Sequence, residues 1–200
     1  MYSMIQNRLR APVTALITPI CRTLLKLGVT PNGVTIAGAA GSVLSSLYFF
    51  SRGEFFIGTL VVSLFVLSDL FDGTMARLSK QGTTRWGALI DSTLDRITDA
   101  AICAGIMIYS YGNNEMVIAL LALFALVTGG LIPYIRAKAE SLGIDCSVGF
   151  AERAERLIIL LVGTGLYGLE LDVALPIALV VVGIAGLVTI AQRLIVVARS

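Results

Sequence analysis

Six apolar stretches, each near the length of a membrane-spanning helix, take up most of this 200-residue chain. A helix needs about 20 consecutive apolar residues to cross the hydrocarbon core of a bilayer. The expected spans cover residues 32–51, 54–76, 88–112, 115–135, 154–170 and 173–195. Hydrophobic residues make up 56% of the chain and charged residues 14%, and a water-soluble fold of this size could not bury that much apolar surface. The sequence therefore predicts an all-α integral membrane protein with six transmembrane helices in a single domain over residues 1–200.

Residues 1–30 have a different pattern from the spans. Apolar residues recur there at intervals of three and four with basic residues between them, which predicts an amphipathic helix in the membrane interface. The apolar positions are Leu9, Val13, Leu16, Ile17, Ile20, Leu24 and Leu27. Pro19 must bend or divide this helix, Gly28 can end it, and Thr30-Pro31 provides an N-cap and a first-turn proline for the first span. For this segment alone, a plain membrane anchor is the favoured interpretation.

The distribution of Lys and Arg predicts the orientation in the membrane, because basic loops stay in the cytoplasm. Arg52 is the only basic residue in the short breaks on one side of the spans. The acidic residues of these breaks are Glu54, Glu115, Glu170 and Asp172. The other basic residues lie in the N-terminal segment, the two longer loops, the third span and the C-terminus. We therefore expect a multi-pass protein of the cell membrane with both termini in the cytoplasm.

The composition excludes several kinds of chemistry. With 15 Lys and Arg against 13 Asp and Glu, the chain lacks the basic excess of a nucleic-acid-binding protein. It has no His, which excludes His metal ligands, His general bases and Ser-His nucleophilic sites. Its three Cys are too far apart in sequence for a paired metal-binding motif. Any chemistry must rest on carboxylates, on Arg and Lys, and on bound metal.

Carboxylates interrupt the second and third spans. Fourteen residues separate Glu54 from Asp69 and cross about 21 Å, less than the ~30 Å hydrocarbon core. Asp69 and Asp72 are therefore expected inside the membrane, where an ionised carboxylate is costly unless it is neutralised. Helical periodicity places these two on one face of their helix, and it does the same for Asp91 and Asp95 on the next helix.

A cluster of carboxylates without His or Cys forms a hard oxygen site, which suits two Mg²⁺ or Mn²⁺ ions. A proton or cation relay of a transporter is one alternative, but these carboxylates gather at the cytoplasmic end of the spans. Structural pairing is another, but Arg77, Arg85 and Arg96 are too few to balance the five carboxylates Asp69, Asp72, Asp91, Asp95 and Asp99. Gly73 and Gly87 also suit close approach of a phosphate to the backbone. Metal-dependent phosphate chemistry is therefore the favoured interpretation.

The spacing of these residues resembles the signature of the CDP-alcohol phosphotransferases, also known as CDP-alcohol phosphatidyltransferases. It reads Asp69-x₂-Asp72-Gly73-x₂-Ala76-Arg77-x₉-Gly87-x₃-Asp91-x₃-Asp95. Residues 89–99, 133–140 and 149–156 further resemble the actinobacterial phosphatidylinositol phosphate synthases of this family. The Asp-Pro-x-Ala-Asp-Lys version that is more usual in phosphatidylglycerophosphate synthases is absent from the sequence.

The resemblance implies a role for each motif residue. The metal ligands would be Asp69, Asp72, Asp91 and Asp95. Asp95 would also be the catalytic base toward the incoming hydroxyl. The CDP-diacylglycerol donor would contact Asn32, Gly33, Val34, Thr35, Gly73, Arg77 and Thr84. Thr83 is the alternative to Thr84, because the length of the preceding loop varies in the family, and Asp99 would support the ligands from outside the motif.

The implied reaction transfers the phosphatidyl group of CDP-diacylglycerol to inositol phosphate and releases CMP on the cytoplasmic side. The acceptor phosphate would be bound by Arg136, Lys138, Arg153 and Arg193, although the positive-inside rule also explains basic residues at these helix ends. A different acceptor, as in phosphatidylglycerophosphate synthases, is the alternative within the family, and an ion or proton transporter is the alternative outside it. The resemblance also implies a homodimer, and the small-residue stretches 38–41 and 183–186 permit close packing within or between subunits.

Cysteine labelling tests the predicted topology. A Cys introduced at Asn113 is expected to react with a membrane-impermeant maleimide on spheroplasts, because residue 113 lies in an outer break. A Cys introduced at Ser200 is expected to react only after the membrane is permeabilised. The unsubstituted chain controls for its own three Cys. Labelling of residue 200 on intact spheroplasts would contradict the orientation.

Overall fold

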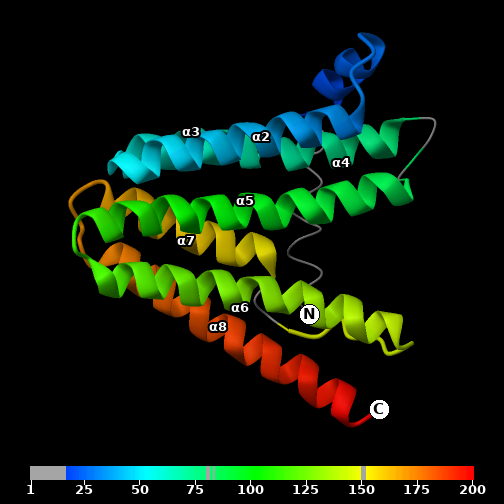
Figure 1. Ribbon diagram of the computed structural model, residues 1–200. Helices are drawn as coiled ribbons and strands as arrows, with labels where there is room; N and C mark the ends of the chain where they lie inside the picture. Colours follow the sequence, from blue (N-terminus) through cyan, green and yellow to red (C-terminus); the bar gives the residue numbers. More distant parts are fainter. Residues whose placement is uncertain (1–16, 80–81, 83, 150–151) are drawn as a thin grey trace. The chain divides into compact units, whose positions relative to one another are not determined.

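The computed structural model describes residues 17–79, 82, 84–149 and 152–200, which form helices joined by turns and loops (Figure 1). The labelled elements are α2 (Pro31–Phe49), η1 (Phe50–Arg52), α3 (Phe55–Val66), α4 (Ser68–Leu78), α5 (Arg85–Gly112), α6 (Met116–Ser141), α7 (Arg153–Tyr167) and α8 (Ala174–Ala198). A further helix covers residues 17–26. Three predicted features lie outside the described residues: the part of the N-terminal helix before residue 17, Thr83, and the side chain of Asp69.

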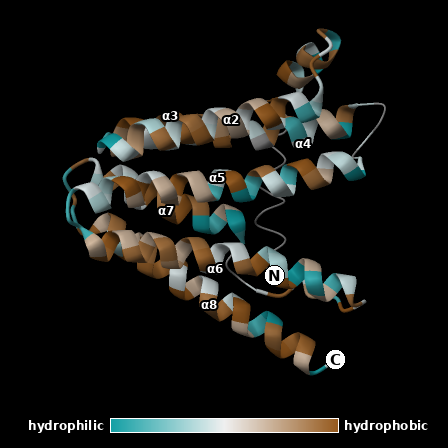
Figure 2. Cartoon of the chain, in the orientation of Figure 1, coloured by the Kyte–Doolittle hydropathy of each residue, from teal (hydrophilic) through white to brown (hydrophobic). Residues whose placement is uncertain are grey.

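Within the described part of the chain, four helical segments are long and apolar enough to cross a membrane. They are Pro31–Arg52, Phe55–Leu78, Met116–Ser141 and Ala174–Ala198. The other two predicted spans differ for separate reasons: α5 has 28 residues but carries several charged side chains in its first half, and α7 has only 15 residues (Figure 2). The structure thus supports a multi-pass, all-helical membrane protein, while the count of six spans stays a prediction.

The chain divides into two compact units. Unit 1 comprises Met1–Ser42 and Ser63–Thr98, and so contains the start of α2, the whole of α4 and the first half of α5. Unit 2 comprises Val43–Val62 and Asp99–Ser200, and so contains α6, α7 and α8. The predicted carboxylate site falls in unit 1 and the predicted acceptor residues fall in unit 2.

In unit 1, the helix over residues 17–26 packs on α4 through a small apolar core. This core consists of Ile17, Cys21 and Met75, with Leu24, Leu25, Val29, Val34 and Phe71 packed against them. The Cys21 thiol donates a hydrogen bond to the carbonyl oxygen of Phe71 at 3.7 Å. Ile20 and Leu27 lie outside the core and are exposed, and Gly28 follows the helix in a left-handed conformation with φ of 82°. The predicted helix end is therefore confirmed, and the location of this helix at the membrane surface stays a prediction.

Threonine N-caps begin both α2 and α5. The Gly33 N–H donates to Thr30 Oγ1 at 3.1 Å and α2 starts at Pro31, which confirms the predicted cap. At α5, the Gly87 N–H donates to Thr84 Oγ1 at 3.0 Å. Such caps satisfy N–H groups that have no partner within the first helical turn.

Small residues bring helices of the same unit close together. In unit 1, a Cβ on Gly41 would lie 2.3 Å from the ring of Phe65. In unit 2, α8 packs on both α6 and α7, and a Cβ on Gly183 would lie 2.3 Å from the ring of Phe124. The stretches around Gly41 and Gly183 therefore make close contacts within one chain.

A substitution at Gly163 tests the packing of α7 on α8. A Cβ on Gly163 would lie 2.3 Å from the Cβ of Ala178, an atom that can move only with its helix. Gly163→Ala is therefore expected to lower the free energy of unfolding by about 1–3 kcal/mol, seen as a lower Tm of the detergent-solubilised protein. Gly130→Ala is the matched control, because no atom lies within 4 Å of a Cβ at that position. Equal Tm values for the two variants would contradict this packing.

Candidate active site

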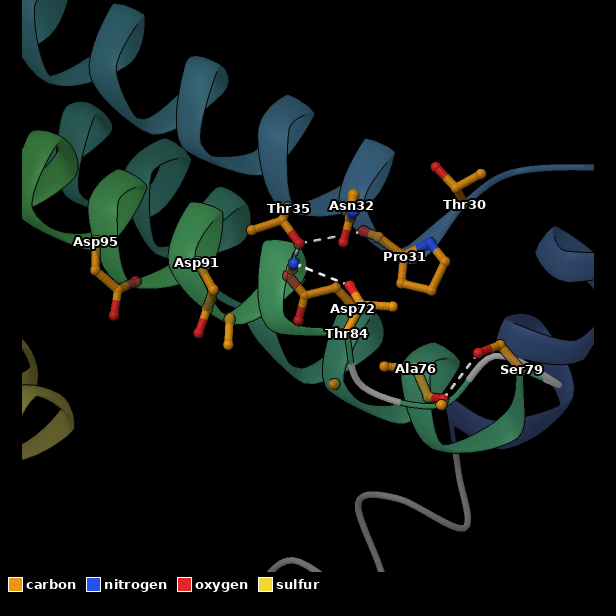
Figure 3. A pocket seen from close by; sticks show the side chains of 14 residues that line it. Thr30, Pro31, Asn32, Thr35, Asp72, Ala76, Ser79, Thr84, Asp91 and Asp95 are labelled. Carbon is orange, nitrogen blue, oxygen red and sulfur yellow. Dashed lines mark hydrogen bonds between the residues drawn. The ribbon is translucent and has the colours of Figure 1, made fainter.

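A cavity of about 500 Å³ lies in unit 1, where the first turns of α2 and α5 meet α4 (Figure 3). Its lining consists of Thr30, Pro31, Asn32, Thr35, Asp72, Gly73, Ala76, Ser79, Gly82, Thr84, Gly87, Ala88, Asp91 and Asp95. The predicted site residues that it brings together are Asn32, Thr35, Asp72, Gly73, Thr84, Asp91 and Asp95. Positions from three helices, far apart in sequence, thus surround one space.

Asp72 is the buried carboxylate of this lining, with 8% of its surface exposed. The Thr35 hydroxyl donates a 2.5 Å hydrogen bond to Asp72 Oδ2 (Figure 3). The same hydroxyl oxygen lies 3.1 Å from the carbonyl oxygen of Pro31, in the turn of α2 that precedes it. A short hydrogen bond to a carboxylate is stronger than one between neutral groups. The α2 helix therefore fixes the orientation of a carboxylate on α4.

Asp91 and Asp95 lie one helical turn apart on α5 and both line the cavity (Figure 3). Asp91 is exposed, whereas the side chain of Asp95 is 19% exposed. Asp95 Oδ2 lies 3.4 Å from a guanidinium nitrogen of Arg96. Carboxylates from two helices therefore face one cavity, as the helical periodicity predicts.

Gly87 lets the first turn of α5 approach the first turn of α2. A Cβ at this position would lie 2.9 Å from Asn32 Oδ1 and 3.1 Å from Thr84 Oγ1. Both helices therefore present their N-terminal ends to the cavity, and these ends carry the positive pole of the helix dipole. Helix N-termini bind phosphate groups through their N–H donors. The cavity thus combines carboxylates with two helix ends that suit an anion.

Three predicted contacts of the donor lie outside the cavity lining. The Gly33 N–H is donated to the Thr30 cap, and Val34 packs against the apolar core of unit 1. Arg77 donates from Nη2 to the hydroxyl of Thr74 at 3.0 Å. Their participation in donor binding stays a prediction.

Some lining residues were not indicated by the motif. Thr30 and Pro31 carry a capping signal in the sequence, but that signal predicts a helix start and not a site. Ser79 and Gly82 follow the end of α4, where no periodicity applies. The Ser79 hydroxyl donates to the carbonyl oxygen of Ala76 at 2.9 Å.

The donor set of the cavity suits a hard divalent cation. Asp72, Asp91 and Asp95 offer only carboxylate oxygens, the ligands that Mg²⁺ and Mn²⁺ prefer. Among the described side chains, no three His, Cys, Asp or Glu are close enough together to hold one metal ion. The side chain of Asp69, the fourth predicted ligand, lies outside the described residues.

The four predicted acceptor ligands lie in unit 2, and two of them have acidic partners there. Arg153 Nε donates to Asp99 Oδ1 at 3.2 Å, which gives Asp99 a partner outside the metal motif. Arg136 Nε donates to Glu140 Oε1 at 2.8 Å, and both side chains are about half exposed. Lys138 lies on the same last part of α6 and is exposed.

Arg193 is buried, with 6% of its surface exposed. Its Nε donates to the carbonyl oxygen of Val148 at 2.9 Å, and its Nη1 donates to the carbonyl oxygen of Ile132. One guanidinium therefore joins α8 to α6 and to the loop between α6 and α7.

Comparisons with known proteins show which family this chain belongs to. A sequence model of the family described as CDP-alcohol phosphatidyltransferase matches residues 28–197. Phosphatidylinositol phosphate synthase of Streptomyces avermitilis is 44% identical over 99% of this chain and 84% of its own, and that of Cutibacterium acnes is 42% identical over 96% of each. The crystal structure of Mycobacterium tuberculosis phosphatidylinositol phosphate synthase with CDP-DAG bound aligns with a TM-score of 0.86 at 40% identity, over 92% of this chain and 94% of that one. A second structure of that enzyme, in complex with manganese and citrate, aligns with a TM-score of 0.85 at 41% identity, over 90% and 88% of the two chains. This chain therefore belongs to the CDP-alcohol phosphatidyltransferase family.

Proposed function

We propose that this phosphatidyltransferase moves the phosphatidyl group of CDP-diacylglycerol to inositol phosphate, giving phosphatidylinositol phosphate and CMP. The observation that carries the proposal is the cavity of unit 1, where carboxylates of α4 and α5 share one space with the N-terminal ends of α2 and α5. The relatives named above support the choice of substrates, because they are phosphatidylinositol phosphate synthases and one has CDP-DAG bound.

The diphosphate of the donor would lie against the first turns of α2 and α5. Asn32, Thr35 and Thr84 offer polar side chains there, and Gly33 and Val34 belong to the same first turn of α2. On α4, Gly73 leaves the backbone open to the cavity. The Nη1 of Arg77 lies 3.9 Å from the position of a Cβ on Gly73, so its guanidinium is close enough to reach a phosphate at the cavity edge.

Asp72 and Asp91, together with Asp69 and Asp95, would hold two divalent cations, Mg²⁺ or Mn²⁺. When bound, such cations offset the charge of the diphosphate and of the departing CMP. The manganese complex of the tuberculosis enzyme supports a divalent cation. The contribution of Thr35 is to hold the buried Asp72 carboxylate in one orientation before ligands arrive.

Asp95 would accept the proton of the acceptor hydroxyl. As the hydroxyl oxygen bonds to the phosphorus of the phosphatidyl group, the bond from that phosphorus to the CMP oxygen breaks, and CMP leaves with the electron pair. Asp95 suits this role because it lines the cavity and is less exposed than Asp91. The phosphate of the acceptor would bind Arg136, Lys138, Arg153 and Arg193 of unit 2.

We extend the proposal to the arrangement in the membrane. In this arrangement α5 and α7 also cross the bilayer, so that the chain has six membrane spans. Both termini and the cavity of unit 1 lie on the cytoplasmic side. The helix over residues 17–26 lies at the membrane surface, where its exposed Ile20 and Leu27 contact lipid. The active protein is a homodimer.

Substitution of the cavity carboxylates tests the assignment of the site. Asp69→Asn, Asp72→Asn, Asp91→Asn and Asp95→Asn are each expected to reduce CMP release from CDP-diacylglycerol by about two orders of magnitude or more, because each removes charge that the metals or the proton transfer require. Asp99→Asn is expected to cost visibly less, since Asp99 pairs with Arg153.

The matched control is Asp145→Asn, at an exposed loop carboxylate that accepts a hydrogen bond from the Ser147 N–H. Its CMP release and its Tm should match those of the unsubstituted protein. Substantial Mg²⁺-dependent CMP release by all four cavity variants would contradict the mechanism.

A separate substitution tests the acceptor. Arg136→Ala is expected to raise the KM for inositol phosphate about 10-fold, equivalent to about 1.4 kcal/mol of binding, and to leave the KM for CDP-diacylglycerol unchanged. Glu140→Ala is the control, because it breaks the ion pair of Arg136 and keeps the cation. An unchanged acceptor KM in Arg136→Ala, or an equal rise in Glu140→Ala, would remove Arg136 from the acceptor site.

A further inference from the structure

Arg77 extends back over the turn of α4 that precedes it. Its Nη2 donates a 3.0 Å hydrogen bond to Thr74 Oγ1, three residues earlier. Its Nη1 lies 3.9 Å from the position of a Cβ on Gly73, four residues earlier, and Gly73 lines the cavity of unit 1. Residues three and four positions apart are neighbours on one side of a helix. One guanidinium therefore has one nitrogen on Thr74 and another beside the cavity.

The position of the Thr74 hydroxyl is fixed by the fold. Thr74 is 2% exposed, whereas Arg77 is exposed. A β-branched side chain in a helix has few χ1 rotamers, so its hydroxyl has few possible positions. The next residue, Met75, is fully buried in the apolar core between α4 and the helix over residues 17–26, which holds this turn of α4 in place. A rigid, buried acceptor thus binds an exposed and otherwise flexible side chain.

The hydrogen bond between Thr74 and Arg77 joins a neutral group to a cation. A guanidinium has only donors, so the Thr74 oxygen is the acceptor. A neutral acceptor orients Arg77 and leaves its positive charge for an anionic ligand, whereas a carboxylate partner would offset that charge. Arg136 and Arg153, in contrast, each form a salt bridge with a carboxylate. The partner of Arg77 is therefore of the kind that suits a cation prepared for a ligand.

A purely structural role is the alternative for this hydrogen bond. Buried hydroxyls nearly always have a partner, and Arg77 could simply provide one. Valine, however, has nearly the shape of threonine and needs no partner, so a buried position alone does not require a hydroxyl. Thr74 also occupies one of the two positions that the motif leaves unspecified between Gly73 and Ala76.

We propose that Thr74 is a positioning residue for donor binding: its hydroxyl holds Arg77 so that the guanidinium faces the diphosphate of CDP-diacylglycerol before the donor arrives. A long side chain loses rotamer freedom when it binds a ligand, and a side chain that is already oriented loses less. This inference rests on the proposed function, which assigns Arg77 to the donor diphosphate.

Direct binding of CDP-diacylglycerol tests the proposal. The Kd is measured by calorimetry on detergent-solubilised protein with Mg²⁺ and without any acceptor. Thr74→Val removes the hydroxyl and keeps the shape, and Thr74→Ser keeps the hydroxyl. Each is made with and without Arg77→Gln, so that the dependence of Thr74 on Arg77 is measured as a double-mutant cycle. Thr164→Val is the matched control, because Thr164 is fully buried in unit 2 and its hydroxyl donates to the carbonyl oxygen of Leu160.

Thr74→Val is expected to raise the Kd for CDP-diacylglycerol about 5-fold in the chain with Arg77 and less than about twofold in the Arg77→Gln chain. Thr74→Ser should stay within about twofold of the unsubstituted protein, because serine offers the same acceptor. Thr164→Val should leave the Kd unchanged. If Thr74→Val does not fold, Thr74→Ala removes the same acceptor and provides the same comparison.

An unchanged Kd in Thr74→Val would overturn the positioning role and leave a structural hydrogen bond. An equal rise in the two backgrounds, or equal Kd values for Thr74→Val and Thr74→Ser, would also overturn it, because Thr74 would then not act through its hydroxyl on Arg77. Failure of the proposed function is distinguishable. In that case Arg77→Gln alone would leave the Kd unchanged, or the unsubstituted protein would not bind CDP-diacylglycerol, and the proposal would fall with the donor site.

Discussion

Charge held among apolar helices is the constraint on which this structure depends. A buried carboxylate or guanidinium needs hydrogen-bonding partners within the protein, because no water is available to it in apolar surroundings. In unit 1 the Thr35 hydroxyl on α2 meets Asp72 on α4, and in unit 2 Arg193 on α8 donates to the Ile132 carbonyl on α6. Each contact fixes the position of one helix along another helix of the same unit. Apolar packing is not directional, so it could not specify that position alone.

The cavity of unit 1 is complementary to a ligand that carries both signs of charge. Carboxylates such as Asp72 and Asp91 would repel a bare diphosphate, whereas the N-terminal ends of α2 and α5 would attract any anion. A diphosphate bound together with divalent cations would suit both features, because Asp72 and Asp91 would hold the cations and the two helix ends would attract the phosphates. Gly87 makes this combination possible by letting the two helix ends approach each other.

Much of this arrangement can be predicted from the sequence, because it depends on local signals. Apolar length predicts the long helices, the Thr30-Pro31 signal predicts the start of α2, and period-3.6 spacing places the carboxylates of each helix on one face. The sequence did not predict which side chains in the first turn of α2 face the cavity. Thr35 points toward Asp72, whereas its neighbour Val34, about 100° away around the helix, packs against the apolar core. The contact of Arg193 with the Ile132 carbonyl could not be predicted at all, since it depends on which helices pack together. Local sequence signals also do not determine the number of membrane spans, because α5 has one charged half and one apolar half.

Identification of the lipid product tests the central claim most directly. Purified protein reconstituted with CDP-diacylglycerol and Mg²⁺ is given equal concentrations of inositol phosphate, free inositol and glycerol phosphate, and the lipids and CMP are quantified by mass spectrometry. The account predicts phosphatidylinositol phosphate as the main new lipid, in a one-to-one ratio with CMP. A main product from glycerol phosphate or free inositol, or CMP release without a new lipid, would contradict it.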